Sequence, residues 1–302
     1  MGVIDLNHKI KFSLEPIFSK KCVFISFKST EKYLGAIPDI TLEVACNEDL
    51  VKPLDKITGK VTSADGFSVN FQAYVYASSY ANNRNIIRML VCDEKFARNV
   101  VTTKYKSIDE ALPACYPMDI VKNCTSAIKG LNLFQENESN HAYLTRLLWG
   151  YKKDTIFGYS LGSVRLHDLN SYKHVYDFGS AENISPIQDT QWGNPKLFTD
   201  KVEIVEEFSR HYAIKFNSSI IYVSKNYKEL LSNYIYNQKF IYSTKGEFEF
   251  TVDYLPPVML TDGVRMVNKD AQMKEYYVNS RTLEFTYNYT KNTFGVSSLK
   301  PI

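Results

Sequence analysis

The sequence lacks the short motifs that mark the common enzyme active sites. It has no G-x-G-x-x-G run, no Walker loop, no H-E-x-x-H and no G-x-S-x-G. The nearest glycine pattern, at Gly158 and Gly162, is explained by a tight turn. These absences do not exclude an enzyme, but they favour a protein that acts through shape and contact.

The chain also has few groups suited to metal binding. Its cysteines are odd in number, widely spaced and without a C-x-x-C pair, so free buried thiols are expected: Cys22, Cys46, Cys92, Cys115 and Cys124. The only combination that suggests a zinc site is Cys115, Cys124 and His141. We therefore expect no metal and no cofactor.

Candidate acid–base residues are equally sparse. His167 and His174 are interpreted as partly exposed loop histidines. Glu206 with Glu207, and Glu247 with Glu249, would imitate a glycosidase pair only if they faced each other across a cleft about 5 to 10 Å wide. No catalytic, cofactor-binding or metal-binding residue is predicted, and the chain is expected not to be an enzyme.

Charge and hydropathy exclude two further classes. The net charge of +3, from 36 basic and 33 acidic residues, is too even for nucleic-acid binding by bulk electrostatics. No window approaches the roughly 18 apolar residues of a membrane span, and the N-terminus has no signal-peptide core.

What the chain does have is aromatic residues. Its 22 tyrosines and 18 phenylalanines, with 44% hydrophobic residues over 302 positions, predict a folded protein rich in strands. Tyrosine also suits surfaces that are buried against partners, since its ring packs while its hydroxyl stays paired.

Residues 1–103, the N-terminal β part, carry strand patterns. Strands are expected at 22–27, 40–45 and 86–92, and Asp65-Gly66 predicts a tight turn. From Phe67 to Val75 apolar and polar residues alternate, which is typical of a half-buried antiparallel strand. Several short strands of this kind predict a small β-barrel.

Residues 104–170, the insert, change period. Ser107 and Glu110 form a capping box for a helix that Pro113 keeps short. A second helix is expected after Asn137 and Ser139, which can cap it, followed by a hairpin of strands 155–159 and 163–166. Residues 124–131 are either helix or strand. The second helix and its hairpin read as a buried connector.

Residues 171–302, the C-terminal β part, return to strands. These are expected at 202–205, 211–216, 220–223, 248–254 and 283–289, with a helix at 227–236. Asp262-Gly263 predicts a turn between 258–260 and 264–267, and Pro256-Pro257 ends the strand before it. The predicted fold class is mainly β: two small β-barrel domains joined by a small α/β insert.

The stretch around the second helix resembles a known family. The positions that carry the resemblance are Gln135, Glu138, Ser139, Tyr143, Leu144, Arg146, Leu147, Leu148 and Gly150. Their pattern is similar to that of the baseplate hub protein of contractile phage tails, and to the hub part of the VgrG spike proteins of type VI secretion. Outside residues 100–170 the resemblance lies only in the order of elements.

The resemblance implies a structural role. In that family three subunits, each with two barrels, close into a roughly sixfold ring that joins the tail tube to the central spike. The expected partners are further copies of the chain, the tube protein, the spike protein and baseplate wedge proteins, with nucleic acid at most as cargo in the channel. The expected location is the virion baseplate, assembled in the host cytoplasm. Because the chain ends just after the last barrel-like strand, a separate spike protein is expected.

Two other functions stay open at this point. One is a carbohydrate-binding or adhesion module that stacks sugars on Trp149 and Trp192. The other is a peptidoglycan hydrolase with dispersed carboxylates.

Overall fold

Strands dominate the part of the chain that the structure describes. A computed structural model describes residues 3–6, 8–32, 37–91, 100–105, 108–115, 119–123, 133–149, 155–168, 174–179, 188–189, 203–207, 211–216, 219–224, 248–267 and 273–298. Apart from one 3-10 turn, the described helices all lie in the insert. The fold class is therefore mainly β with a small α/β insert, as the sequence predicts.

A single sheet of 13 strands runs through both β parts. The N-terminal part supplies seven neighbouring strands in the order β1-β2-β5-β6-β7-β4-β3. These strands, with the 3-10 turn η1 (Ile17–Ser19), are β1 (Val3–Leu6), β2 (Ile10–Glu15), β3 (Val23–Lys32), β4 (Asp39–Ala45), β5 (Lys56–Ser63), β6 (Ser68–Ala81) and β7 (Arg84–Leu90).

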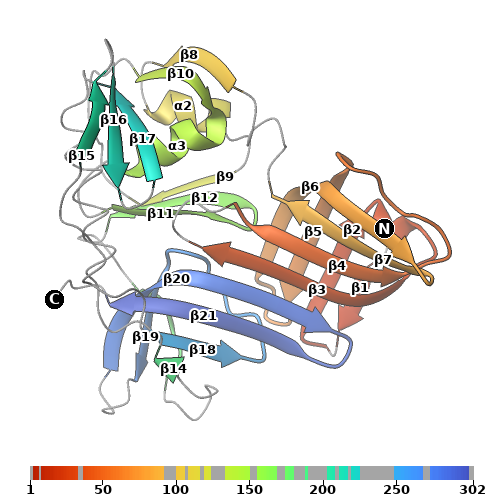
Figure 1. Cartoon of the computed structure of the whole chain (residues 1–302). Helices are drawn as coiled ribbons and strands as arrows, with labels where there is room; N and C mark the ends of the chain where they lie inside the picture. The colour runs from red at the N-terminus through yellow and green to blue at the C-terminus, as the bar shows by residue number, and fades with distance from the viewer. Residues whose placement is uncertain are drawn as a thin grey trace.

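The C-terminal part continues the same sheet. Its strands there are β13 (His174–Asp177), β14 (Gln188–Asp189), β18 (Phe248–Val252), β19 (Gly263–Val267), β20 (Met273–Thr286) and β21 (Thr290–Ser298). The long strand β20 pairs with β21 along one edge, and with β19 and then β3 along the other. The sequence predicts a connection through the insert, whereas the structure adds this direct β3–β20 ladder (Figure 1).

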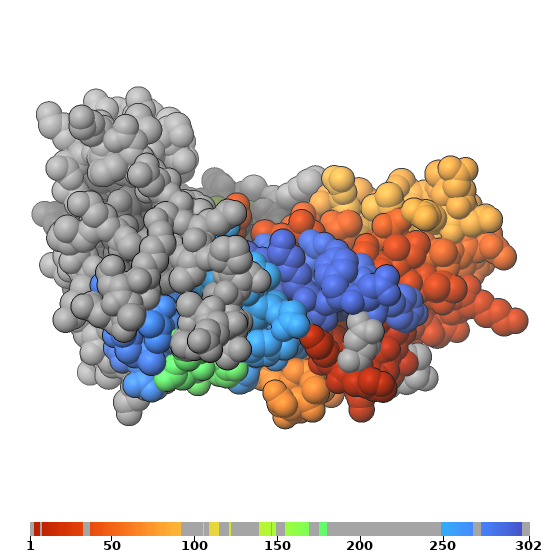
Figure 2. Space-filling view, turned by 90° about the horizontal axis from the view of Figure 1, so that it is seen from below, coloured from red at the N-terminus to blue at the C-terminus, as the bar shows by residue number. Residues whose placement is uncertain are grey.

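The β3–β20 ladder brings the two β parts into direct contact. Figure 2 shows the surface of the C-terminal strands, in blue, running without a gap into the red and orange surface of the N-terminal part. Phe27 of β3 and Phe285 of β20 stack with their ring centroids 4.8 Å apart. Phe285 therefore belongs to the core of the N-terminal part, although 258 positions separate it from Phe27 in the sequence (285 − 27).

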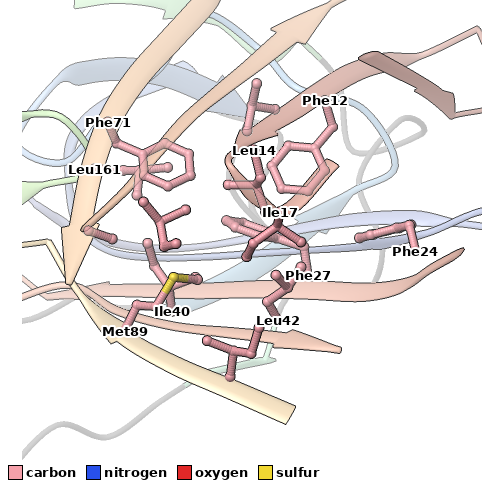
Figure 3. Packing of buried hydrophobic residues seen from close by; sticks show 14 of the residues in the cluster. Phe12, Leu14, Ile17, Phe24, Phe27, Ile40, Leu42, Phe71, Met89 and Leu161 are labelled. Atoms are coloured by element: carbon pink, nitrogen blue, oxygen red, sulfur yellow. The ribbon is translucent and has the colours of Figure 1, made fainter. Parts of the chain in front are cut away.

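The predicted alternation of the long strand is confirmed in β6. Val69, Phe71, Ala73 and Val75 are buried, while the residues between them are exposed or half-buried. The Asp65-Gly66 turn is also present: Gly66 has a positive φ of 88° and its amide donates to the carbonyl of Ser63. This local pattern sets which face of β6 points into the core shown in Figure 3.

The insert, together with residues 100–103 just before it, forms two small sheets and two helices. Strands β8 (Val100–Tyr105) and β10 (Leu133–Ser139) pair with each other, and β9 (Asp119–Asn123) joins the hairpin of β11 (Thr155–Ser160) and β12 (Ser163–Asp168). The helices are α2 (Ile108–Cys115) and α3 (Asn140–Trp149). Figure 1 shows the β9-β12-β11 sheet between α3 on one side and the long sheet on the other.

Helix α3 has the buried face that the sequence predicts. Tyr143, Leu144, Leu147 and Leu148 are all buried. Ser139 caps the helix, because its hydroxyl accepts a hydrogen bond from the amide of Ala142 at 3.1 Å. The expectation that Asn137 also caps it is wrong, because Asn137 belongs to β10, at the irregularity between the paired residues Gln135 and Glu138.

The C-terminal part differs from expectation at two turns. The stretch 258–260 is not a strand, and the turn at Asp262 leads into β19, which pairs with β20 and β13. The alternation expected over 283–289 stops at Thr286, because Tyr287 and Tyr289 lie in the turn between β20 and β21. Three predicted strands are confirmed as β15 (Glu203–Glu207), β16 (His211–Phe216) and β17 (Ser219–Ser224). Residues 124–131 and 227–236 lie outside the described residues.

The tip of the β11–β12 hairpin inserts into the N-terminal part. Leu161 is buried beside Phe71 in that core (Figure 3). Gly162 has a φ of +91°, and a Cβ built on it would lie 2.2 Å from the carbonyl oxygen of Asn70 in β6. A side chain at position 162 is therefore excluded both by conformation and by the close approach of β6.

Candidate functional site

Buried charges gather where the N-terminal part, the insert and the C-terminal part meet. We call these residues the junction cluster: Glu31, Ser160, Arg165, Asp262 and Arg281. They come from β3, β11, β12, the turn before β19, and β20. No other described side chain as large as Arg281 is buried so completely.

Glu31 and Arg281 form the centre of the cluster. They are direct partners in the β3–β20 ladder, both side chains are fully buried, and Arg281 Nη1 lies 3.7 Å from Glu31 Oε1. Ser160 donates a hydrogen bond to the other oxygen of Glu31. Arg281 Nε donates to Asn292 Oδ1 at 3.3 Å, so the cation also binds the neighbouring strand β21.

Burial dominates the electrostatics of Arg281. Taking the guanidinium out of water lowers its pKa, while the carboxylates of Glu31 and Asp262 act in the opposite direction. An arginine stays protonated in proteins even so, and a buried charge is tolerated only when it is paired. The fold must therefore keep Glu31 opposite Arg281.

A second ion pair attaches the insert to the C-terminal part. Arg165 Nη2 of β12 contacts Asp262 Oδ1, and Asp262 Oδ2 accepts a hydrogen bond from the amide of Met259 at 2.8 Å. Burial raises the pKa of Asp262 above its usual value, although Arg165 and the amide of Met259 counteract this shift. The pair therefore fixes the hairpin of the insert against the turn that leads into β19.

The junction cluster is suited to holding segments of the chain together. Its charges are used in pairing with one another, and they join three segments that are far apart in the sequence. Such pairs fix one arrangement of the surrounding elements more than they add net stability.

The histidines predicted in loops lie elsewhere. The prediction for His167 is wrong: it belongs to β12 and is 5% exposed, and burial together with Arg165 lowers its pKa to about 3. His141 in α3 packs against the ring of Tyr159, and burial lowers its pKa to about 4. His174 begins β13, and its side chain lies outside the part that the structure describes.

Cysteines and metal ligands give no site within the described ranges. Cys22 is half-buried and Cys46 buried, and both are free, as predicted. Cys115 ends α2, while Cys92 and Cys124 lie outside the described residues. Among the residues that the structure describes, no three His, Cys, Asp or Glu side chains are grouped as metal ligands. None of the described helices combines the length and the apolar character that crossing a bilayer requires.

Where the structure describes them, the carboxylate and tryptophan candidates belong to three separate elements. Glu206 and Glu207 lie in β15, and Glu249 is half-buried in β18, in a different sheet. Trp149 is the last residue of α3. Glu247 and Trp192 lie outside the described residues.

Sequence reasoning missed the junction cluster, although one signal for it exists. Arg281 is in phase with the buried residues Leu283 and Phe285 of β20. Glu31 is likewise in phase with Phe27 of β3. A charge of each sign on the apolar phase of two strands indicates a buried ion pair between them.

Removal of one junction charge should destabilise the protein strongly. Arg281→Met leaves Glu31 buried without its cation, so the free energy of unfolding in urea should fall by about 3 to 5 kcal/mol. Adding Glu31→Leu should recover part of that loss, because no unpaired charge then remains. Exposed Lys28 and half-buried Glu284 are a matched control in the same ladder, with Nζ and Oε2 3.6 Å apart, and Lys28→Met should cost less than about 1 kcal/mol. Equal costs for Arg281→Met and Lys28→Met would contradict the assignment.

Buried histidines should make the protein less stable in acid. The pKa of His167 is lowered when folded, so its contribution is complete above the unfolded value near 6.5 and is lost as pH falls toward about 3. Between pH 7.5 and 5.0 this loss amounts to about 2 kcal/mol, measured by urea unfolding at each pH. His167→Gln should remove that dependence, while His8→Gln should not, because the side chain of His8 is 98% exposed. An unchanged pH profile in His167→Gln would count against the buried neutral histidine.

Among the comparisons with known proteins, only the comparison with solved structures finds matches. No family model matches the sequence, and no curated protein matches it either. The 43 kDa tail protein of prophage MuSo2 from Shewanella oneidensis superposes with a TM-score of 0.61 at 12% identity, over 96% of this chain and 97% of that one. A tail protein from Neisseria meningitidis gives a TM-score of 0.57 at 11% identity, over 96% of this chain and 97% of that one.

Secretion-system proteins share the architecture as well. An E. coli component of the type VI secretion system, structurally similar to the T4 bacteriophage tail proteins gp27 and gp5, superposes with a TM-score of 0.60 at 10% identity, over 96% of this chain and 76% of that one. The Francisella PdpA–VgrG complex contains a chain that matches with a TM-score of 0.53 at 12% identity, over 98% of this chain and 53% of that one. The chain therefore has the fold shared by these phage tail and type VI secretion proteins, which confirms the predicted resemblance at the level of fold.

Proposed function

We propose that the protein is a structural subunit of a contractile tail or injection machine, and more narrowly its baseplate hub. Three copies close into a ring that joins the tail tube to the central spike. The protein acts through assembly and carries out no reaction of its own.

One observation carries this proposal. The structural match spans 96% of this chain and 97% of the Shewanella tail protein, so it includes both β parts and the insert rather than one common barrel. A likeness limited to one β part would be compatible with many functions, because small barrels serve many purposes.

The continuous sheet and its buried contacts suit a subunit that carries mechanical force between two partners. The β3–β20 ladder makes the seven N-terminal strands and six C-terminal strands one hydrogen-bonded sheet. The Arg165–Asp262 ion pair and the Ser160–Glu31 hydrogen bond then fix the insert against the C-terminal and the N-terminal part. A subunit built this way would transmit force from tube to spike without bending at a linker.

Ring closure requires a large and specific interface. An obligate interface buries on the order of 2,000 Å² or more, and cyclic symmetry prevents open-ended association. Two β parts in each of three subunits would give six similar units, which would let a threefold ring face a sixfold tube. Exposed aromatic side chains suited to such contacts lie on β6 and on the β20–β21 turn: Tyr76, Tyr80, Tyr287 and Tyr289.

The proposed partners follow from this role. They are further copies of the chain, the tube protein, the spike protein and baseplate wedge proteins, with nucleic acid only as cargo in the channel. The proposed location is the tail baseplate of the virion, after assembly in the host cytoplasm.

The mass of the full chain in solution tests the proposal. Light scattering or native mass spectrometry should show three copies of the 34.7 kDa chain in each particle, either alone or in complex with the tube and spike partners. Negative-stain images of the same sample should show a closed ring with threefold symmetry. A strict monomer at high concentration, with those partners present, would contradict the hub assignment.

A further inference from the structure

Two cysteines face each other at one end of the N-terminal part. Cys22 immediately precedes β3 and Cys46 immediately follows β4. The last pairs at this end of the β3–β4 ladder are Val23 with Ala45 and Phe24 with Val44. The same register continued by one residue places Cys22 directly opposite Cys46.

Both thiols point to the same side of the sheet. Phe24 of β3 and its partner Val44 of β4 are buried. Val23, the first residue of β3, is 60% exposed. Because side chains alternate along a strand, the next residue outward points inward again. Cys46 belongs to the hydrophobic core at 6% exposed, and the half-buried Cys22 packs against that core.

The backbone geometry is the kind that brings opposite side chains closest. The amide of Cys46 donates to the carbonyl of Asn83 at 2.9 Å, so its polar groups point toward β7 and away from β3. Cys22 and Cys46 therefore form a non-hydrogen-bonded pair, for which the Cα atoms lie about 4.5 Å apart. That separation is within the range of about 4.4 to 6.8 Å that a disulfide spans.

In the present state both thiols are reduced. Cys22 Sγ donates to the carbonyl of Ile17 and Cys46 Sγ to the carbonyl of Lys21, each at 3.5 Å. Burial raises the pKa of the Cys22 thiol, and the neighbouring Cys46 adds to this shift. The pair should therefore react faster in mild alkali, where the thiolate forms.

We propose that Cys22 and Cys46 are a redox site that closes into a cross-strand disulfide when the protein meets a small-molecule disulfide oxidant. The more exposed Cys22 attacks one sulfur of the oxidant as a thiolate, forming a mixed disulfide and releasing one thiol. Cys46 then attacks Cys22 Sγ and releases the second thiol. The two cysteines lose two electrons and two protons, and the oxidant becomes two thiols.

The bond would attach the start of β3 to the end of β4. It would close the segment 22–46 and restrict the unfolded chain, so the oxidised protein should melt about 5 °C higher than the reduced protein. The thiol–carbonyl contacts of the reduced state would be given up in exchange.

Peptide mapping of the full chain tests the proposal. The folded protein is incubated with oxidised glutathione at pH 8.5, quenched with N-ethylmaleimide and digested with trypsin. Cleavage after Lys28 and Lys32 separates the two cysteines, so the bond appears as peptide 22–28 linked to peptide 33–56, lighter by two hydrogen atoms than the free pair. Dithiothreitol should reverse both the link and the rise in melting temperature.

Two variants separate the steps. Cys46→Ser should retain a stable glutathione adduct on Cys22, because the second thiol is gone. Cys22→Ser should leave Cys46 without an adduct, because that sulfur is buried. A glutathione adduct that persists on Cys22 in the unmodified chain, or oxidation that leaves both cysteines free for alkylation, would overturn the proposal.

Discussion

The buried ion pair between Arg281 and Glu31 is the constraint on which the arrangement of the chain depends. A guanidinium removed from water needs a carboxylate beside it, and Glu31 of β3, the direct ladder partner of Arg281, supplies one. This requirement sets the register of β20 against β3. The register in turn brings Phe285 onto Phe27, so the aromatic core of the N-terminal part is completed from the far end of the chain.

The insert is held by the same cluster and by Leu161, which is buried in the core of the N-terminal part. Ser160 binds Glu31, and the next residue, Leu161, enters the core beside β6. Arg165 on the return strand reaches Asp262 in the C-terminal part. A connector that contacts both halves at one point gives a rigid subunit, which is what a hub between tube and spike would need. The proposed cysteine pair lies at the other end of β3, where it would restrain the N-terminal part without touching this junction.

Local features of the fold could be predicted, and long-range ones could not. Period-two alternation in β6, the Gly66 turn, the buried face of α3 and the β11–β12 hairpin depend on neighbouring residues, so their patterns are visible in sequence. The pairing of β3 with β20 joins residues about 250 positions apart and leaves no local pattern. The one available clue, a charge on the apolar phase of each strand, acquires meaning only when the two strands are placed side by side. The cap expected at Asn137 fails for a related reason, since the pairing of β10 with β8 extends to Ser139 and places Asn137 inside the strand.

Native-state hydrogen exchange tests most directly whether the two β parts are one cooperative unit. Amides in the β3–β20 and β3–β4 ladders should open with a single free energy, equal to that of global unfolding, and Arg281→Met should lower it equally in both. Exchange of β19, β20 and β21 at a clearly lower free energy than β3 and β4 would contradict the account. It would mean that the two parts are separate bodies in contact rather than one sheet.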